Sequence, residues 1–381
     1  MTTARILILQ AMCKQYRAPL FATMHQQLAT HAIELRVAYS EPVDGHRSRN
    51  DNVDLPALYG LKVPGRSLFG GRLFSQLPLQ AIARADLVIV EHALKHLINY
   101  PLLALSCCRA KKVAFWLHGG TLRHGPASLA RSLRKQLLLT ADWVFSYTEG
   151  VARDAIALGA DPRHITPLQN AIDLTSFYAA LAAVTEPDLA AARARLSLPP
   201  DASIALFCGS LYAGRGIDFL VSAGDRIAAR DPAFHLIVLG TGPLLFQLQA
   251  EAAGRPWLHC LGSLFGDERA VYFRLAQVCL MPYLAGLGIL DAMAAGLPYI
   301  VTGALATNPE IEYLVDHVTG LVTGDDVAAY ADAVASLLHD PPRLHAMGEA
   351  ARLASRRYSI ENMASNFCRG IRQCLSEGGT L

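Results

Sequence analysis

A glycine-bearing loop followed by a helix is the segment of this chain best suited to hold an anion. A predicted strand ends in a loop that contains Gly286, Leu287 and Gly288, and the predicted helix after it carries Asp291 in its first turn. Glycines before a helix let backbone N–H groups approach a phosphate, and the helix dipole favours negative charge there. Asp291 is the only acid between residues 269 and 309, so it is placed to accept a hydrogen bond from a sugar hydroxyl. Stabilisation of the helix by its charge is the plain alternative.

A second candidate site follows a predicted strand in the second half of the chain. Gly209 and Ser210 leave this strand, and Arg215 stands between two glycines in the same loop. Open α/β sheets bind ligands at the carboxyl ends of their strands, and a planar guanidinium suits a diphosphate. Gly240 and Gly242 follow another predicted strand and belong to the same set of candidates. An ordinary solvated loop charge is the alternative for Arg215.

A histidine ends a buried strand in the first half of the chain. His118 follows the predicted strand 112–117 and precedes Gly119 and a second glycine. An imidazole at a strand's carboxyl end can hydrogen-bond a sugar or orient a reacting hydroxyl. Simple packing beside Trp116 is the alternative for this residue.

Several common catalytic motifs are absent from the sequence. It contains no GxxxxGK[ST] phosphate loop and no complete GxGxxG, because the segments that begin at Gly214 and Gly240 both lack the third glycine. Neither GxSxG nor HExxH occurs. These absences disfavour a nucleotide kinase, a common dehydrogenase, a serine hydrolase of that type and a zinc protease.

The elements that must position these residues alternate along the chain. Short apolar runs separated by longer helical stretches are typical of parallel sheets with crossover helices. The first series of predicted strands comprises residues 5–10, 34–39, 86–91, 112–117, 142–147 and 164–168. The second series comprises residues 203–208, 235–239, 257–261, 278–282 and 299–302. We therefore predict an α/β protein with two doubly wound domains that face each other.

An alanine-rich stretch separates the two series. Residues 178–203 end in a Pro-Pro-Asp stop and predict a linking helix at a domain boundary. We place the N-terminal domain at residues 1–180 and the C-terminal domain at residues 200–357. We expect a last helix, 358–377, to pack back on the first domain.

Composition narrows the class of protein. The chain has 381 residues, a net charge of +2, 52% hydrophobic residues and 17% charged residues, so it holds enough apolar material for folded domains. The small net charge argues against a general nucleic-acid binder. A mean hydropathy of +0.27 raises the question of a membrane span, but no run of about 18 uncharged apolar residues occurs. The first residues do not predict a signal peptide, and we expect a cytoplasmic protein.

Charge is divided unevenly between the two halves. Residues 1–178 contain 20 Lys or Arg and 12 Asp or Glu, whereas the remainder contains 14 and 20. Part of the basic excess lies with leucines in residues 122–139, which include Arg123, Arg131, Arg134 and Lys135. Such a segment can lie on an anionic membrane surface, which predicts a peripheral protein on the inner face. A solvated helix that packs its leucines on the sheet is the alternative, and we favour it slightly.

The eight cysteines do not indicate a metal or disulfide site. They include no CxxC pair and lie mostly in apolar segments, which predicts small buried side chains.

Taken in order, several motifs resemble those of the family 4 glycosyltransferases. The second half resembles their nucleotide-sugar-binding domain through CGSLYAGRGIDFL (208–220), LIVLGTGPL (236–244), LGILDAMAAGLPYIVT (287–302) and NPEIEYLVDHVTGLV (308–322). The first half resembles their acceptor domain through WLHGG (116–120), SYTEGVARDAIALGA (146–160) and LQNAIDLTSF (168–177). The resemblance implies the GT-B fold, in which two Rossmann-like domains face each other across a cleft. It also implies a nucleoside diphosphate sugar as co-substrate and no cofactor or metal.

The donor residues carry over with two departures from the family pattern. The family supplies two cations to the donor diphosphate; here Ser210 stands at the first position and Arg215 at the second. The family also has two Glu separated by seven residues, and this chain has Asp291 at the second position and no acid at the first. A branch of polysaccharide-building transferases has a similarly short loop before this helix. We expect Glu310 to assist donor binding in place of the missing acid.

The resemblance implies a retaining hexosyltransferase of bacterial-type polysaccharide or glycoconjugate assembly. It would move a sugar from the donor to a hydroxyl of a glycan or lipid-linked acceptor. Its catalytic residues would be His118, Arg215 and Asp291, with the Gly286 loop and the helix dipole stabilising the departing diphosphate. The expected acceptor contacts are Tyr16, Arg17, Glu91, His118 and Gly119.

Two other classes of function remain open from the sequence. A GT-B-fold nucleotide-sugar epimerase or hydrolase would use the same donor site without an acceptor. A non-catalytic scaffold would keep the fold after losing the first acid and one cation.

Overall fold

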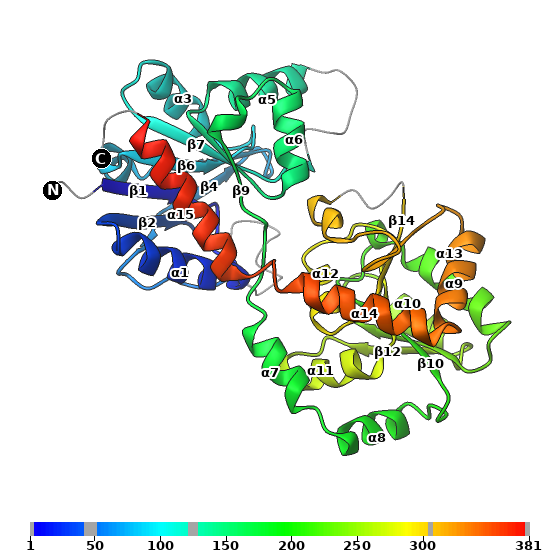
Figure 1. The fold of residues 1–381 in the computed structure, drawn as a ribbon. Helices are drawn as coiled ribbons and strands as arrows, with labels where there is room; N and C mark the ends of the chain where they lie inside the picture. The colour runs from blue at the N-terminus through cyan, green and yellow to red at the C-terminus, as the bar shows by residue number, and fades with distance from the viewer. Residues whose placement is uncertain (1–3, 42–51, 121–128, 304–307, 378–381) are drawn as a thin grey trace. The chain divides into compact units, whose positions relative to one another are not determined.

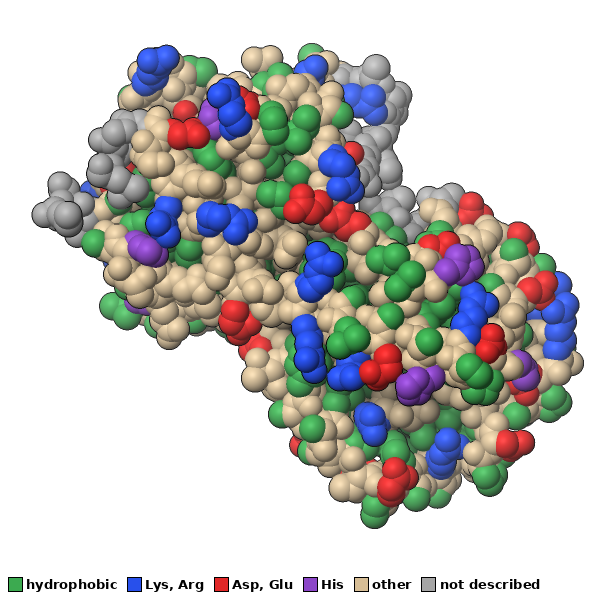
Figure 2. Space-filling model, in the orientation of Figure 1, with side chains coloured by type: hydrophobic (Ala, Val, Ile, Leu, Met, Phe, Trp, Pro, Cys, Tyr) green, Lys and Arg blue, Asp and Glu red, His purple; other side chains and the backbone are tan. Residues whose placement is uncertain are grey.

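The computed structural model describes residues 4–41, 52–120, 129–303 and 308–377, and it divides into two units (Figure 1). The first unit comprises Met1–Asp173 and Ser359–Leu381, and the second comprises Leu174–Tyr358. On the face drawn in Figure 2, Lys and Arg side chains are interspersed with Asp and Glu, in keeping with the small net charge. None of the described helices is both long and apolar enough to cross a membrane.

The first unit is built on a parallel sheet of seven strands in the order β3-β2-β1-β6-β7-β8-β9. These strands are β1 (Ala4–Leu9), β2 (Ile33–Tyr39), β3 (Gly60–Lys62), β6 (Leu87–Glu91), β7 (Lys112–Leu117), β8 (Trp143–Ser146) and β9 (Ile165–Pro167). A separate antiparallel hairpin joins β4 (Gly65–Leu68) to β5 (Leu73–Gln76). The central strands are buried on both faces, because helices cover a parallel sheet on both sides.

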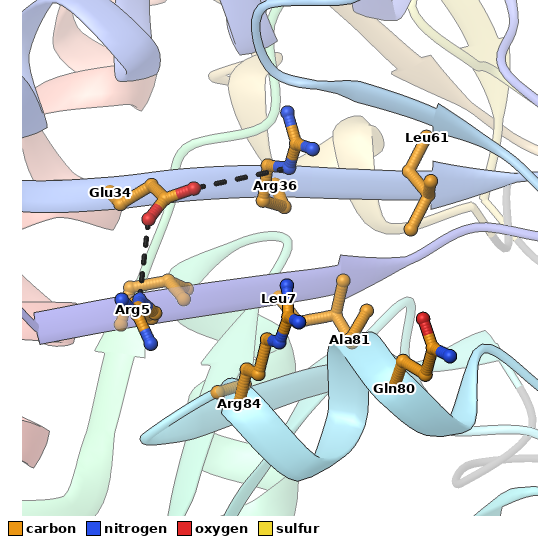
Figure 3. A pocket seen from close by; sticks show the side chains of 10 residues that line it. Arg5, Leu7, Glu34, Arg36, Leu61, Gln80, Ala81 and Arg84 are labelled. Atoms are coloured by element: carbon orange, nitrogen blue, oxygen red, sulfur yellow. Dashed lines mark ion pairs between the residues drawn. The ribbon is translucent and has the colours of Figure 1, made fainter.

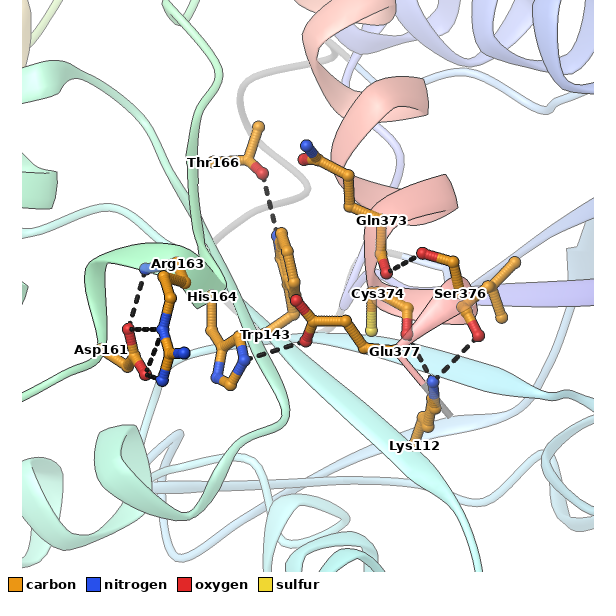
Figure 4. A network of polar contacts seen from close by, with 11 residues as sticks. Lys112, Trp143, Asp161, Arg163, His164, Thr166, Gln373, Cys374, Ser376 and Glu377 are labelled. Carbon is orange, nitrogen blue, oxygen red and sulfur yellow. Dashed lines mark hydrogen bonds and ion pairs between the residues drawn. The ribbon is translucent and has the colours of Figure 1, made fainter. Parts of the chain in front are cut away.

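The helices of the first unit include one from the far end of the chain. Its helices are α1 (Ala18–Ala29), α2 (Leu79–Arg84), α3 (Asn99–Cys107), α5 (Leu129–Thr140), α6 (Glu149–Ala157) and α15 (Ile360–Ser376), with short 3₁₀ turns at Gln15–Arg17 and Pro162–His164. Helix α15 packs beside α1 and against β8 and β9 (Figure 1). Figure 4 shows its last turn, where Lys112 Nζ donates to the carbonyls of Cys374 and Leu375, and His164 Nε2 lies 2.9 Å from Glu377 Oε2.

The second unit repeats this design with a parallel sheet of six strands in the order β12-β11-β10-β13-β14-β15. These are β10 (Ser203–Cys208), β11 (Phe234–Leu239), β12 (Leu258–Gly262), β13 (Val278–Leu280), β14 (Tyr299–Thr302) and β15 (Gly320–Thr323). Its helices are α7 (Thr175–Ala183), α8 (Glu186–Arg195), α9 (Ile217–Ala228), α10 (Leu245–Ala252), α11 (Gly266–Leu275), α12 (Gly288–Ala294), α13 (Val327–Leu338) and α14 (Pro341–Ser355). Two 3₁₀ turns, Ala213–Arg215 and Pro309–Tyr313, lie in its loops.

The prediction of two doubly wound parallel sheets is confirmed, and all eleven predicted strands are present. Four strands were missed: β3, β4, β5 and β15. All four have at most four residues and lie at a sheet edge or in the hairpin, and three of them include exposed positions. They therefore lack the continuous apolar run that a buried parallel strand shows.

The alanine-rich stretch forms two helices instead of one linking helix. Thr185 caps α8 in a capping box with Asp188 and so ends α7 before it. Both helices pack on α11, with the rings of Phe177 and Phe273 5.1 Å apart in an edge-to-face arrangement. The stretch therefore belongs to the second unit, and the chain passes between the units at residues 173–174 and 358–359.

The cysteines only partly follow their prediction. Cys13, Cys279, Cys368 and Cys374 are buried, and all eight cysteines are free thiols. Cys107 and Cys108 are exposed at the end of α3, where the helix leaves the core.

Candidate functional site

A pocket of about 230 Å³ lies where β10, β11 and β12 end. Gly209 and Ser210 leave β10 into it, Gly240 leaves β11, and Arg269 reaches it from α11. Because parallel strands deliver their carboxyl ends to one edge of the sheet, loops far apart in the sequence meet here. The structure thus brings three of the predicted donor residues together with Arg269, which was not among the candidates.

The two glycines after β11 are required by the fold itself. A Cβ atom on Gly240 would lie 1.9 Å from the carbonyl oxygen of Gly209, and one on Gly242 would lie 2.2 Å from that of Leu211. Since real Cβ contacts are never this short, only glycine fits at these positions. The two glycines therefore allow the loops that form the pocket to pack together, whether or not they touch a ligand.

The glycines after β13 differ in this respect. A Cβ atom on Gly286 would find its nearest atom at 3.6 Å, and one on Gly288 at 3.9 Å, both ordinary contacts. Neither packing nor a left-handed backbone explains these two glycines. Helix α12 has only seven residues, so its dipole is small.

Asp291, in the first turn of α12, is paired with Arg269. The Nη2 atom of Arg269 lies 3.0 Å from Asp291 Oδ1, and Nη1 lies 3.2 Å from Oδ2. The Asp291 side chain is about nine-tenths buried; this burial raises the pKa of its carboxyl, and the guanidinium opposes that rise. The pair presents a fixed charge-assisted hydrogen-bonding unit at the edge of the pocket.

Aromatic rings hold Arg269 in place. Its guanidinium lies 4.4 Å from the ring centroid of Phe177 and 5.4 Å from that of Phe273. Both contacts are within the range of cation–π attraction. The sequence signal that could have identified Arg269 is its place in the first turns of a helix that follows a strand's carboxyl end, the same place that identified Asp291.

Arg215 ties its loop to the loop before α12. Its Nη1 donates to the carbonyl of Leu284 at 2.6 Å, and Leu284 itself has a left-handed backbone, with φ of 44°. The Nε atom of Arg215 and the hydroxyl of Tyr299 are buried without a partner among the residues described. Arg215 thus anchors the Leu284 carbonyl through a hydrogen bond in addition to carrying charge.

The remaining donor candidates are placed less directly. Leu287 is the N-cap residue of α12, and Glu310 is 3% exposed in the 3₁₀ turn Pro309–Tyr313. Neither lines the pocket after β10, β11 and β12, and the other predicted donor residues that are absent from its lining are Arg215, Gly242, Gly286, Gly288 and Asp291.

In the first unit, His118 is exposed at the end of β7 and rests on Tyr147, with ring centroids 4.7 Å apart. Gly119 follows with φ of 91°, and a Cβ atom there would lie 2.3 Å from Val151 Cγ2. Gly119 is therefore required for the tight turn that carries His118 over helix α6.

Arg17 is a buried residue, whereas we expected it to contact the acceptor. It is 3% exposed, its Nη1 donates to Asn170 Oδ1 at 2.8 Å, and its Nη2 donates to the Tyr147 hydroxyl at 2.8 Å. The guanidinium also lies 4.7 Å from the ring centroid of Trp116. These partners use its donors, so Arg17 positions Tyr147, which in turn supports His118.

Tyr16 and Glu91 complete the expected acceptor contacts. Tyr16 is 41% exposed beside Arg17, and Glu91 is partly exposed at the end of β6. Burial raises the pKa of Glu91 and lowers that of His96, 3.5 Å away, to about 4. His96 is therefore neutral at pH 7, and the two side chains do not form a charged pair.

Comparison with known proteins identifies a family model that matches most of the second unit. Residues 202–340 match the family model described as "Glycosyl transferases group 1". The chain is 31% identical over 238 residues to a D-inositol 3-phosphate glycosyltransferase 2 of Catenulispora acidiphila, covering 57% of this chain and 52% of that protein. The chain thus spans about half the length of the curated relatives it matches.

Solved structures match over nearly the whole chain. A glycosyltransferase from Rickettsia africae superposes with a TM-score of 0.72 at 14% identity, covering 99% of this chain and 100% of that one. HepE of Anabaena, in complex with UDP, superposes with a TM-score of 0.67 at 15% identity, covering 97% and 99%. The chain therefore has the GT-B fold, and its residues 202–340 match the family model of the group 1 glycosyltransferases.

Proposed function

We propose that this protein is a retaining glycosyltransferase that moves a sugar from a nucleoside diphosphate donor to a hydroxyl of a glycan or lipid-linked acceptor. The observation that carries the proposal is the pocket after β10, β11 and β12, within residues 202–340, where the Arg269–Asp291 pair meets the glycine loops. We further propose that the reaction serves polysaccharide or glycoconjugate assembly.

The chemistry requires stabilisation of the leaving group. When the anomeric bond breaks, negative charge grows on the diphosphate, and preorganised cations and N–H groups lower that barrier. Arg215, anchored by the Leu284 carbonyl, and the backbone of Gly286 and Gly288 are the groups that we assign to this task. The Arg269–Asp291 pair would bind the donor ribose hydroxyls, with Asp291 accepting and Arg269 holding the carboxylate in orientation.

In the first unit we assign the sugar contact to His118. Its support runs from Asn170 through Arg17 and Tyr147, so the imidazole stands on a buried, hydrogen-bonded base. Retention would follow if the acceptor attacks from the side of the departing phosphate, which then takes the hydroxyl proton. Arg17 acts in this scheme as a positioning residue.

A panel of nucleoside diphosphate sugars, assayed for released nucleotide with and without candidate acceptors, tests the reaction class. We expect release that depends on the acceptor and a product with the donor's anomeric configuration by NMR. An epimerised or freed sugar formed at full rate without acceptor would contradict the transferase and favour an epimerase or hydrolase. Failure of every nucleoside diphosphate to bind, with Arg215→Ala unchanged, would favour a scaffold.

Replacing Arg269 separates its role in binding from its role in stability. Arg269→Leu leaves the Asp291 carboxylate buried without its partner, so we expect a loss of about 3 kcal/mol in stability and weaker binding of the nucleoside diphosphate. The double variant Arg269→Leu/Asp291→Leu should recover stability but not binding. Thermal unfolding and calorimetric titration measure both. Arg274→Leu, an exposed change on the same helix, is the matched control.

Replacing a glycine that the packing requires and a glycine that it does not require should affect stability differently. Gly240→Ala forces a Cβ atom onto the Gly209 carbonyl, and we expect a loss of at least about 2 kcal/mol in unfolding free energy. Gly288→Ala has room for its methyl group and should keep the wild-type melting temperature while weakening diphosphate binding. Normal binding by Gly288→Ala would remove the backbone of this loop from the proposed donor site.

We also propose that helix α5 contacts an anionic membrane surface on the cytoplasmic side. Leu137 and Leu138 pack inward, whereas Leu129 is 78% exposed and Leu133 is 44% exposed on a helix with basic residues. Arg123 lies outside the described residues. Flotation with liposomes should recover more protein when anionic lipid is present, and Leu129→Ser/Leu133→Ser should reduce that recovery. Equal recovery on neutral liposomes would exclude the contact.

A further inference from the structure

A cavity of about 500 Å³ lies in the first unit between the sheet and helix α2 (Figure 3). Strand β1 contributes Arg5 and Leu7, strand β2 contributes Glu34 and Arg36, and α2 contributes Arg84. Side chains two residues apart on a strand share one face, so both pairs point to the same side of the sheet. Arg5 and Glu34 are second in their strands, which places the cavity toward the amino ends of β1 and β2, away from the ends that carry Glu91 and His118.

The lining of this cavity has more cationic donors than the protein satisfies. Arg5 Nε lies 3.4 Å and Arg36 Nε lies 4.0 Å from the Glu34 carboxylate, both longer than a charge-assisted hydrogen bond (Figure 3). The Arg84 guanidinium forms no hydrogen bond or ion pair with any residue of the described ranges. With three arginines and one glutamate, the lining carries a formal charge of +2.

Of the three guanidiniums, that of Arg36 is held by hydrogen bonds, and the neighbouring charges include Lys111 and Asp86, whose Oδ2 accepts from the backbone N–H of Arg5 at 2.8 Å. Arg36 Nη1 donates to the carbonyls of Ala57 at 3.1 Å and Leu58 at 3.0 Å, which orients its fork. Lys111 Nζ donates to the carbonyl of Ala83 at 3.2 Å and to that of Ala85, at the end of α2. The cavity is therefore a cationic site with one oriented guanidinium, that of Arg36.

The floor of the cavity is apolar. Leu7 is 1% exposed and Ala85 is 3% exposed, and both belong to the core cluster under the sheet. Leu61 and Ala81 pack against the same cluster and also line the cavity. A ligand that fits this lining combines an anionic group at the arginines with an apolar portion at the floor.

We propose that this cavity binds an organic phosphate monoester with an apolar portion, as a second site separate from the proposed donor site. The formal charge of +2 matches a phosphate dianion, and guanidinium forks match its oxygens. A volume of about 500 Å³ is in the range of small-molecule sites. The phosphate can belong to a free metabolite or to a lipid headgroup, and the experiment distinguishes these two sources.

Calorimetric titration at constant ionic strength tests the site with phenyl phosphate as the probe and phenyl glucoside as its neutral counterpart. We expect phenyl phosphate to bind and the glucoside not to bind. Arg84→Gln should weaken binding about tenfold, because one fork of charge-assisted hydrogen bonds is lost. Arg72→Gln, an equal change of charge at an exposed residue outside the lining, should leave the affinity unchanged. Arg84 has no partner to lose, so its variant should melt at the wild-type temperature.

Two further arms complete the test. Saturating UDP should not displace phenyl phosphate, because the donor pocket lies in the other unit; displacement would overturn the second site while leaving the proposed function intact. Vesicles that contain phosphatidic acid replace phenyl phosphate in the last arm. Binding that depends on Arg84 supports the site in either arm, and the arm that binds names the source. Equal binding by wild type, Arg84→Gln and Arg72→Gln, or no binding in either arm, overturns the proposal.

Discussion

The close approach of two backbone loops at the ends of β10 and β11 is the constraint on which the candidate donor site depends. Gly240 and Gly242 leave no room for side chains against the carbonyls of Gly209 and Leu211. Any other residue would separate the loops and open the pocket. In the sheet order β12-β11-β10-β13, strand β10 lies between β11 and β13. The loop after β13 therefore lies at the same edge of the sheet, next to the loop after β10. The position of Asp291 thus depends on packing around two glycines that lie about 50 residues before it in the sequence.

A pocket that binds a diphosphate needs positive charge in addition to close backbone packing. The second unit supplies arginines whose guanidiniums already have protein partners. Arg269 is paired with Asp291, and Arg215 donates to the Leu284 carbonyl. A buried ion pair adds little net stability, because desolvation offsets most of its attraction. The Arg269 guanidinium contacts two aromatic rings and one carboxylate. We therefore infer that these contacts serve to orient Arg269 more than to stabilise the fold.

Much of the fold was predictable, because parallel strands are buried on both faces and show as apolar runs. The short strand β3, with no fully buried residue, gave no such signal. Local motifs identified Asp291 and the glycine loops, whereas Arg269 lies 22 residues before its partner and no local pattern joins them. Arg17 was misplaced for a related reason: Trp116, Tyr147 and Asn170 enclose it, and they come from three distant segments.

The arginines of the two units differ in how they are paired, in keeping with the uneven charge of the two halves of the chain. In the second unit, Arg215 and Arg269 both donate to protein acceptors, so an incoming diphosphate must compete with or extend existing hydrogen bonds. In the cavity between α2 and the sheet, the ion pairs are long and Arg84 is unpartnered. Unpaired guanidiniums respond to salt more than paired ones, because no neighbouring carboxylate already screens them. Anion binding by the first unit should therefore weaken more steeply with ionic strength than nucleotide binding by the second.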